Sequence, residues 1–113
     1  MHELSLTQGM LGVIEDAARR DGFARVKTVW LEVGRLASVE LDALRFCFDV
    51  VTRGSCAEGA RLEIDSPPGR AWCLACSEAV VIETALSACP RCGSQQLQVT
   101  GGNDMRVREL EVE

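Results

Sequence analysis

The sequence has no tyrosine, one histidine, three prolines, three phenylalanines and two tryptophans. With so few aromatic side chains, the core must be built from aliphatic residues. Hydrophobic residues nevertheless make up 47% of the 113 positions, which suits one folded globular domain and argues against disorder. If such a core is divided between two modules, each module buries too few apolar residues to be stable alone. We therefore expect an additional source of stability, such as a bound metal.

Basic charge is also scarce. Twelve lysines and arginines face 17 aspartates and glutamates, and the net charge is −5. Nucleic acids and anionic membranes attract proteins with a surplus of positive charge, so neither is an expected partner. No apolar run approaches the roughly 20 residues that span a membrane, and no basic segment leads into an apolar one at the N-terminus. We therefore expect a cytoplasmic protein.

Signatures of catalysis are missing as well. The only histidine is His2, which leaves no imidazole to act as a base beside a nucleophile elsewhere in the sequence. The sequence also lacks a Gly-x4-Gly-Lys-Ser/Thr loop for nucleotide phosphates. It therefore predicts that the protein is not an enzyme.

Hydrophobic periodicity predicts two helices. Apolar residues recur at helical spacing over residues 4–21, where Ser5 and Gln8 resemble a capping box at the start. A second amphipathic helix is expected from Ser38, as its N-cap, to the neighbourhood of Gly54. Both helices have one apolar stripe to bury against another layer.

Three segments have the composition and alternation of strands. Residues 25–34 are rich in β-branched side chains, and residues 60–65 alternate apolar with charged positions. Residues 105–113 return to this pattern, with a shift between Val107 and Leu110 that indicates a bulge or an edge strand. We expect the three strands to pair in one sheet.

A Ser-Pro-Pro-Gly motif then interrupts the alternation and marks a domain boundary. The predicted fold is α+β, with two helices packed on a small three-stranded sheet formed by residues 1–68 and 99–113. A zinc-ribbon module over residues 69–98 is inserted between these two parts. Inside the module, alternation predicts one strand, around Val80 and Ile82.

Four cysteines in the inserted module have the spacing of a metal site. A C-x2-C pair is separated by 12 residues from a second such pair, and the four cysteines are Cys73, Cys76, Cys89 and Cys92. Two such turns can bring four thiolates to about 2.3 Å from one tetrahedral Zn²⁺. Pro90 and Gly93 suit the second turn, whereas Ser77 stands where a glycine is expected in the first. Four thiolates leave no open position for water, so the predicted zinc is structural.

Three other uses of these cysteines fit the sequence less well. Two disulfides would suit the number but not a reducing cytosol. A rubredoxin-like iron site uses similar pairs, but no aromatic cluster is at hand to shield it. A nucleic-acid-binding ribbon needs a basic surface, yet the module has two basic and two acidic side chains, Arg70, Arg91, Glu78 and Glu83. Of the other cysteines, we expect Cys47 to be a small buried hydrophobe, and Cys56 lacks a partner that would activate it.

The first three residues bring several metal donors together. They supply the amine of Met1, the imidazole of His2 and the carboxylate of Glu3. In model peptides the amine and the imidazole can both be unprotonated near neutral pH. Coordination through the amine, the His2 amide and the His2 ring would close a five-membered and a six-membered ring, and such planar ligation suits Ni(II) or Cu(II). The alternative interpretation is an incidental, frayed terminus.

The chain resembles the HypA/HybF family of nickel metallochaperones, which serve the maturation of NiFe hydrogenases. The resemblance spans MHELSLTQ, VWLEVGRLASVELDALRFCFDVVTRGS, EGARLEI, the pair CLAC and CPRCGS, and MRVRELEVE. It implies that nickel, as a transferred cargo, is bound by His2, Glu3 and the Met1 amine. It further implies structural zinc on the four cysteines, a partner GTPase named HypB, and delivery to the hydrogenase large-subunit precursor, with other nickel enzymes such as urease served in some relatives.

A different class of function remains open at this point. The chain could be a regulatory or interaction protein built around a structural zinc ribbon, with an N-terminus that binds nothing. Metal analysis separates the two hypotheses, since a carrier should hold one zinc and one exchangeable nickel, and a zinc-ribbon protein should hold zinc alone.

Overall fold

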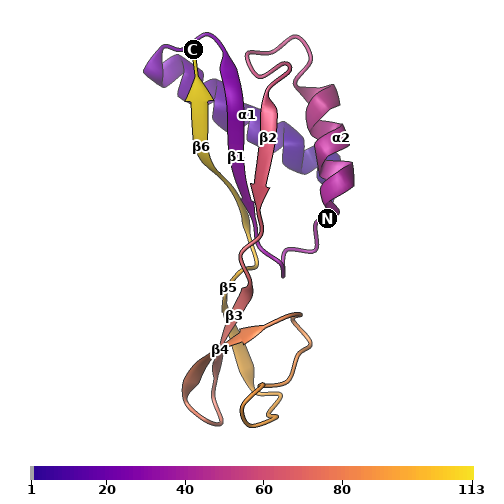
Figure 1. Cartoon of the computed structure of the whole chain (residues 1–113), viewed down its shortest axis with the longest axis vertical. Coiled ribbons are helices and arrows are strands. Elements are labelled where there is room, and N and C mark those ends of the chain that lie inside the picture. The colour runs from indigo at the N-terminus through magenta and orange to yellow at the C-terminus, as the bar shows by residue number, and fades with distance from the viewer. Residues whose placement is uncertain (1) are drawn as a thin grey trace. The chain divides into compact units, whose positions relative to one another are not determined.

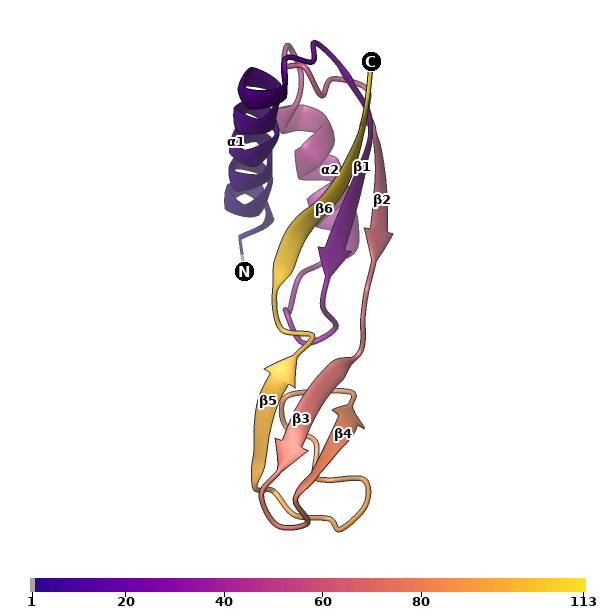
Figure 2. The same ribbon diagram turned by 90° about the vertical axis from the view of Figure 1, so that its left-hand side faces the viewer.

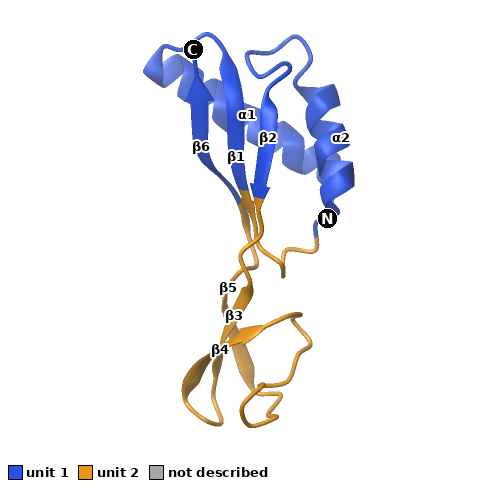
Figure 3. Cartoon of the chain, viewed as in Figure 1, with its two compact units in different colours: residues 1–31, 39–64, 106–113 blue, residues 32–38, 65–105 orange. Residues whose placement is uncertain are grey.

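The computed structural model describes residues 2–113 and divides into two compact units (Figure 3). The first unit comprises residues 1–31, 39–64 and 106–113, and the second comprises residues 32–38 and 65–105. The elements follow the order α1 (Glu3–Asp21), β1 (Val26–Val33), α2 (Leu41–Val51), β2 (Arg61–Asp65), β3 (Gly69–Cys73), β4 (Glu78–Ile82), β5 (Leu97–Gly101) and β6 (Met105–Val112) (Figure 1). The predicted α+β class, with two helices on a three-stranded sheet and a four-cysteine module, is confirmed.

Helix α1 begins earlier than its sequence predicts. Its N-cap is His2, whose extended backbone precedes the helix and whose side chain makes no capping bond. The backbone N–H of Leu6 already donates to the His2 carbonyl at 3.1 Å. Ser5 therefore lies inside the first turn, and the predicted capping box of Ser5 and Gln8 is wrong. Glu3 instead supplies the acidic residue that the positive end of the helix dipole favours.

Helix α2 is capped by Glu40, not by Ser38. The Glu40 carboxylate accepts a hydrogen bond from the N–H of Asp42 at 3.0 Å. Ser38 lies outside the helix with a positive φ of 56°. At the other end the hydroxyl of Thr52 donates to the Phe48 carbonyl at 2.7 Å, so the helix closes before Gly54.

The first sheet has the order β2-β1-β6, with β1 in the middle. Figure 2 shows β1 and β2 running in the same direction, β6 running in the opposite one, and both helices on one face. Parallel neighbours need a crossover connection, and α2 supplies it. The core between sheet and helices is mainly aliphatic, as expected, although it includes Phe48, and its most deeply buried side chains include Ile14, Val29, Leu31 and Leu44. Neither helix of residues 2–113 is long and apolar enough to cross a bilayer.

The second unit is built on an antiparallel sheet of order β4-β3-β5. Its core consists of Ala71, Cys73, Val80, Ile82 and Cys89, with Leu36, Cys76 and Leu97 packed against it. The strand predicted around Val80 and Ile82 is β4, whereas β3 and β5 were not predicted. This core is small, so the cysteines occupy positions that a larger domain would fill with aliphatic side chains.

Residues 32–38 belong to the second unit because they are bonded to it along their backbone. The N–H groups of Gly34, Arg35 and Leu36 donate to the carbonyls of Asp104, Pro67 and Gly102, at 2.9, 3.0 and 2.7 Å. Gly34 lies so near Gly102 that a Cβ on it would be 2.2 Å from the Gly102 carbonyl. The segment therefore packs at backbone-to-backbone distance, which only glycine permits here.

Candidate metal centres

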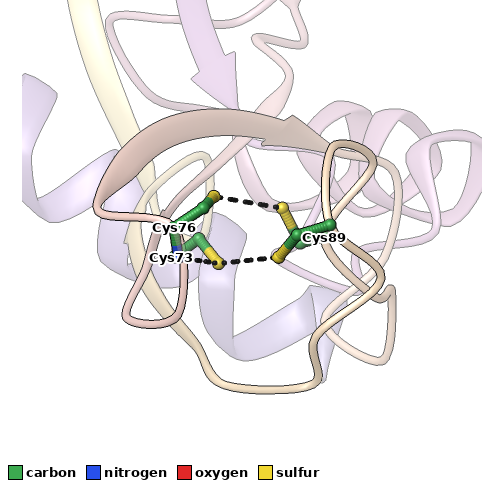
Figure 4. A group of neighbouring side chains, drawn as sticks. Cys73, Cys76 and Cys89 are labelled. Atoms are coloured by element: carbon green, nitrogen blue, oxygen red, sulfur yellow. Dashed lines mark hydrogen bonds between the residues drawn. The ribbon is translucent and has the colours of Figure 1, made fainter.

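The four cysteines of the second unit converge on one point (Figure 4). Cys73 ends β3, Cys76 follows it in the next turn, and Cys89 and Cys92 lie in the loop between β4 and β5. All four sulfur atoms lie within 4.8 Å of one another. The Sγ atoms of Cys73 and Cys92 are 3.6 Å apart, and those of Cys76 and Cys89 are 3.9 Å apart.

These distances fit a tetrathiolate site. Zn–S bonds of about 2.3 Å in a tetrahedron put neighbouring sulfurs about 3.8 Å apart. A disulfide would put them about 2.05 Å apart, and all six cysteines are free thiols. Thiolate ligands in this geometry favour zinc or iron over hard cations. The arrangement thus opposes the disulfide alternative and satisfies the geometry of a structural zinc ion.

The two turns that hold the cysteine pairs have the same backbone geometry despite their different sequences. In the first turn the N–H of Ser77 donates to the Cys73 carbonyl at 2.9 Å, and in the second Gly93 donates to the Cys89 carbonyl at 2.8 Å. Both donors have positive φ, 55° for Ser77 and 76° for Gly93. The serine therefore adopts a conformation that glycine adopts without strain.

Backbone N–H groups also point at the sulfurs. The N–H of Cys76 donates to the Cys73 sulfur at 3.5 Å, and that of Arg91 donates to the Cys89 sulfur at 3.4 Å. Backbone donors, first that of Cys92 and then that of Arg91, lower the pKa of the Cys89 thiol to about 7. A hydrogen bond to Cys73 together with desolvation raises the pKa of Cys76 to about 12. In the metal-free cluster Cys89 therefore loses its proton more readily than Cys76.

The N-terminal donors lie in the first unit. Met1 is outside the described residues, so its predicted role is not addressed by the coordinates. His2 is exposed, and Glu3 is half-buried at the start of α1. The Glu3 carboxylate accepts a hydrogen bond from the N–H of Glu40 at 3.4 Å. Glu40 is a residue that the sequence analysis missed, and no local pattern could reveal a partner 37 positions away.

The two remaining cysteines lie apart from these groups. Among residues 2–113, the only set of three or more candidate ligands that converges is the four-cysteine cluster. Cys47 is half-buried on α2, and Cys56 is half-buried in the following loop, where its carbonyl accepts from the N–H of Val26 at 2.9 Å. Neither joins a metal site.

Comparison with known proteins decides the family. A family model described as "Hydrogenase/urease nickel incorporation, metallochaperone, hypA" matches residues 1–112. The chain belongs to the HypA family. Hydrogenase maturation factor HypA of Albidiferax ferrireducens is 62% identical over 113 residues, and that of Azotobacter chroococcum is 58% identical, each over the full length of both chains. The resemblance drawn from the sequence motifs is confirmed.

Solved structures support the HypA fold. The solution structure of the Ni metallochaperone HypA from Helicobacter pylori has a TM-score of 0.75 and 23% sequence identity, and the match covers 99% of this chain and 97% of that one. A second solution structure of a HypA protein has a TM-score of 0.73 at 22% identity. Members of the HypA family are metallochaperones and maturation factors, so the prediction that this chain is not an enzyme is confirmed.

Proposed function

We propose that this HypA family member carries Ni(II) at its N-terminus, on the Met1 amine, His2 and Glu3, and delivers it to a maturing nickel–iron hydrogenase. The observation that supports this function most strongly is the full-length match to a family of nickel-incorporation metallochaperones. A carrier must bind its cargo firmly enough to select it and loosely enough to release it. A short chelating terminus meets this requirement better than a closed cage.

The surroundings of His2 support this nickel site. The His2 side chain is exposed and makes no capping bond, so the imidazole is available to a metal. The bond from Glu40 to the Glu3 carboxylate ties the first turn of α1 to the start of α2. Carboxylates at two helix N-termini, from Glu3 and from Asp42, add negative charge to this end of the first unit. That charge favours a divalent cation.

Zinc is proposed for the four cysteines, as a structural ion that is not transferred. The support comes from the sulfur distances and from the small core of the second unit, which contains two of the ligands themselves. A structural zinc ion supplies folding free energy on the order of 10 kcal/mol in comparable small sites. We therefore expect chelation of zinc to unfold the second unit.

The remaining parts of the proposal concern partners and location. The family resemblance implies the GTPase HypB as a partner and the hydrogenase large-subunit precursor as the recipient, and other nickel enzymes are further candidates. The proposed site of action is the cytoplasm. A net charge of −5 is compatible with carrying a cation.

The test measures metal content and nickel affinity on untagged, zinc-loaded protein. We expect one tightly bound zinc and one exchangeable nickel by elemental analysis and calorimetry. The substitution His2→Ala should abolish the nickel site, whereas Gln8→Ala, at an exposed position six residues further along the chain, should leave it intact. Retention of nickel by His2→Ala, nickel bound among the sulfurs, or zinc as the only bound metal would overturn the carrier function.

A further inference from the structure

A hollow lies on the face of the first sheet that the helices do not cover. It has a volume of about 400 Å³ and is lined by Thr28 and Trp30 of β1, Arg61 and Glu63 of β2, and Glu111 of β6. Along β1 these positions alternate with Val29 and Leu31, which are buried against the helices. Figure 2 shows both helices on the opposite side of the three strands. The hollow therefore opens away from the core of the first unit.

The two carboxylates of the hollow are held in place by neighbours. The hydroxyl of Thr28 donates to Glu111 Oε1 at 2.8 Å, and Thr28 itself is buried. Arg61 Nη2 lies 2.8 Å from Glu63 Oε1, so this arginine neutralises Glu63. Arg61 is the one basic side chain among the residues that line the hollow, and it pairs with Glu63. Glu111 accepts its hydrogen bond from a neutral hydroxyl, so it is the lining carboxylate without a basic partner in the hollow.

Trp30 gives the hollow an aromatic wall. It is one of two tryptophans in the chain, and it is half-buried on the uncovered face of the central strand. An indole ring attracts a cation placed over its face, most strongly when water is partly excluded. An aromatic face beside a carboxylate without a basic partner in the hollow favours an ammonium or guanidinium group. An anion would meet two carboxylates and an arginine that is already paired.

We propose that this hollow binds a lysine or arginine side chain presented by a partner protein. Its volume of about 400 Å³ lies at the small end of the range for ligand pockets, about 300 to 1,000 Å³, and leaves room for one long side chain. The net charge of −5 would attract a basic segment of a partner toward the chain. The Glu111 carboxylate pairs with the cation, and the ring of Trp30 contacts the aliphatic stem and the charged head. None of the residues that line the hollow is a candidate metal ligand.

The experiment follows Trp30 directly. In the zinc-loaded variant Trp72→Phe, Trp30 is the only tryptophan, because the chain has two. This protein is titrated with the blocked tripeptides acetyl-Gly-Arg-Gly-amide, acetyl-Gly-Lys-Gly-amide and acetyl-Gly-Gln-Gly-amide, and binding is read from Trp30 fluorescence and from its indole N–H resonance. We expect saturable, millimolar binding of the two cationic peptides that weakens with added salt, and no saturation by the glutamine peptide.

Two variants distinguish binding in the hollow from nonspecific attraction to the negatively charged surface. Glu111→Gln keeps an acceptor for the Thr28 hydroxyl but removes the charge, and it should weaken binding of the arginine peptide at least about fivefold, as expected for loss of a charge partner. Glu15→Gln removes the same charge from an exposed position of α1, on the other side of the sheet, and should change binding by less than about twofold. Equal binding of the glutamine peptide, or unchanged binding by Glu111→Gln, would overturn the proposal. So would tighter binding of free spermidine, which would assign the hollow to a small polyamine.

Discussion

The carboxylate of Glu3 accepts a hydrogen bond from the backbone N–H of Glu40 at 3.4 Å. This bond joins the first residue of α1 to the N-cap of α2, and it lies next to the proposed nickel ligand His2. The carboxylate is thus engaged in orienting the terminus. We therefore propose that the backbone amide of Glu3 completes the planar nickel site, because one oxygen of its carboxylate is already hydrogen-bonded.

This relationship predicts different effects for two substitutions of Glu3. Glu3→Gln keeps an oxygen acceptor for the Glu40 N–H, so nickel affinity should stay within about threefold of the parent. Glu3→Ala removes the acceptor, and the loss of one hydrogen bond, about 1 kcal/mol, should weaken nickel binding roughly fivefold. Calorimetry on zinc-loaded protein measures both affinities. Equal weakening by both substitutions would show that the carboxylate binds nickel directly.

Nickel binding should also require a free N-terminus. Placing Gly-Ser before Met1 moves the amine away from His2 and prevents the five- and six-membered chelate rings. We expect the nickel affinity to fall at least about tenfold, as in the loss of a chelating donor. The same two residues added after Glu113 serve as the control. Circular dichroism and zinc content should be unchanged in both proteins, and nickel binding that survives the N-terminal extension would contradict the chelate.

Zinc affinity should depend on pH in a way that Cys89 dictates. The pKa of Cys89 is lowered to about 7, so above this pH zinc meets a thiolate there, and below it zinc must displace a further proton. A plot of the logarithm of apparent zinc affinity against pH should therefore become steeper by one proton as the pH falls through about 7. Competition with a chromophoric chelator between about pH 6 and 8 measures this slope.

Two cysteine variants test whether this pH dependence comes from the cluster. Cys47→Ser should leave both the zinc affinity and its slope unchanged, because Cys47 lies outside the four-sulfur group. Cys89→Ser should lose tight zinc binding at every pH. A constant slope in the parent protein across this range would show that Cys89 is not the first thiol to lose its proton.

The first turn that holds a cysteine pair should gain stability from a single substitution. Ser77 has a φ of 55°, a region that costs a residue with a Cβ about 1 kcal/mol or more. Ser77→Gly removes that cost and should raise the stability of the zinc-loaded second unit by up to about 1 kcal/mol. The reverse change, Gly93→Ala at a φ of 76°, should lower it by about 1–2 kcal/mol. Ser66→Gly, at a position without positive φ, should give no gain. Thermal unfolding should therefore give the highest unfolding temperature for Ser77→Gly, an unchanged one for Ser66→Gly and the lowest for Gly93→Ala.

The sequence predicted those parts of the fold that depend on local periodicity. Apolar residues at helical spacing revealed α1 and α2, and alternation revealed the three strands of the first sheet. The cysteine spacing predicted the convergence of four sulfurs because two short turns can close on one ion without help from distant residues. These features follow from residues close together in the chain.

The missed features depend on small residues or distant partners. Strand β3 buries Gly69, Ala71 and Cys73. These three residues are small and do not form the row of large apolar side chains by which a strand is predicted from sequence. Local sequence favours serines as the N-caps of both helices, Ser5 for α1 and Ser38 for α2, but neither serine caps its helix. The cap of α2, Glu40, accepts from Asp42 two positions along the chain, through a side chain that is not a typical cap. Its N–H donates to Glu3, 37 positions away, and sequence patterns carry no information on such a pair.

The contact between Gly34 and Gly102 leads to a matched pair of alanine substitutions. A Cβ on Gly34 would lie 2.2 Å from the carbonyl carbon and oxygen of Gly102, which are backbone atoms and cannot swing aside. Gly34→Ala should therefore destabilise the protein by about 2 kcal/mol or more, in the range of overpacked sites. Gly12→Ala adds a Cβ that meets nothing within 4 Å in the interior of α1, and it should stabilise by up to about 1 kcal/mol. Opposite shifts of the unfolding temperature are expected, and a neutral Gly34→Ala would mean that residues 32–38 do not pack against the second unit in solution.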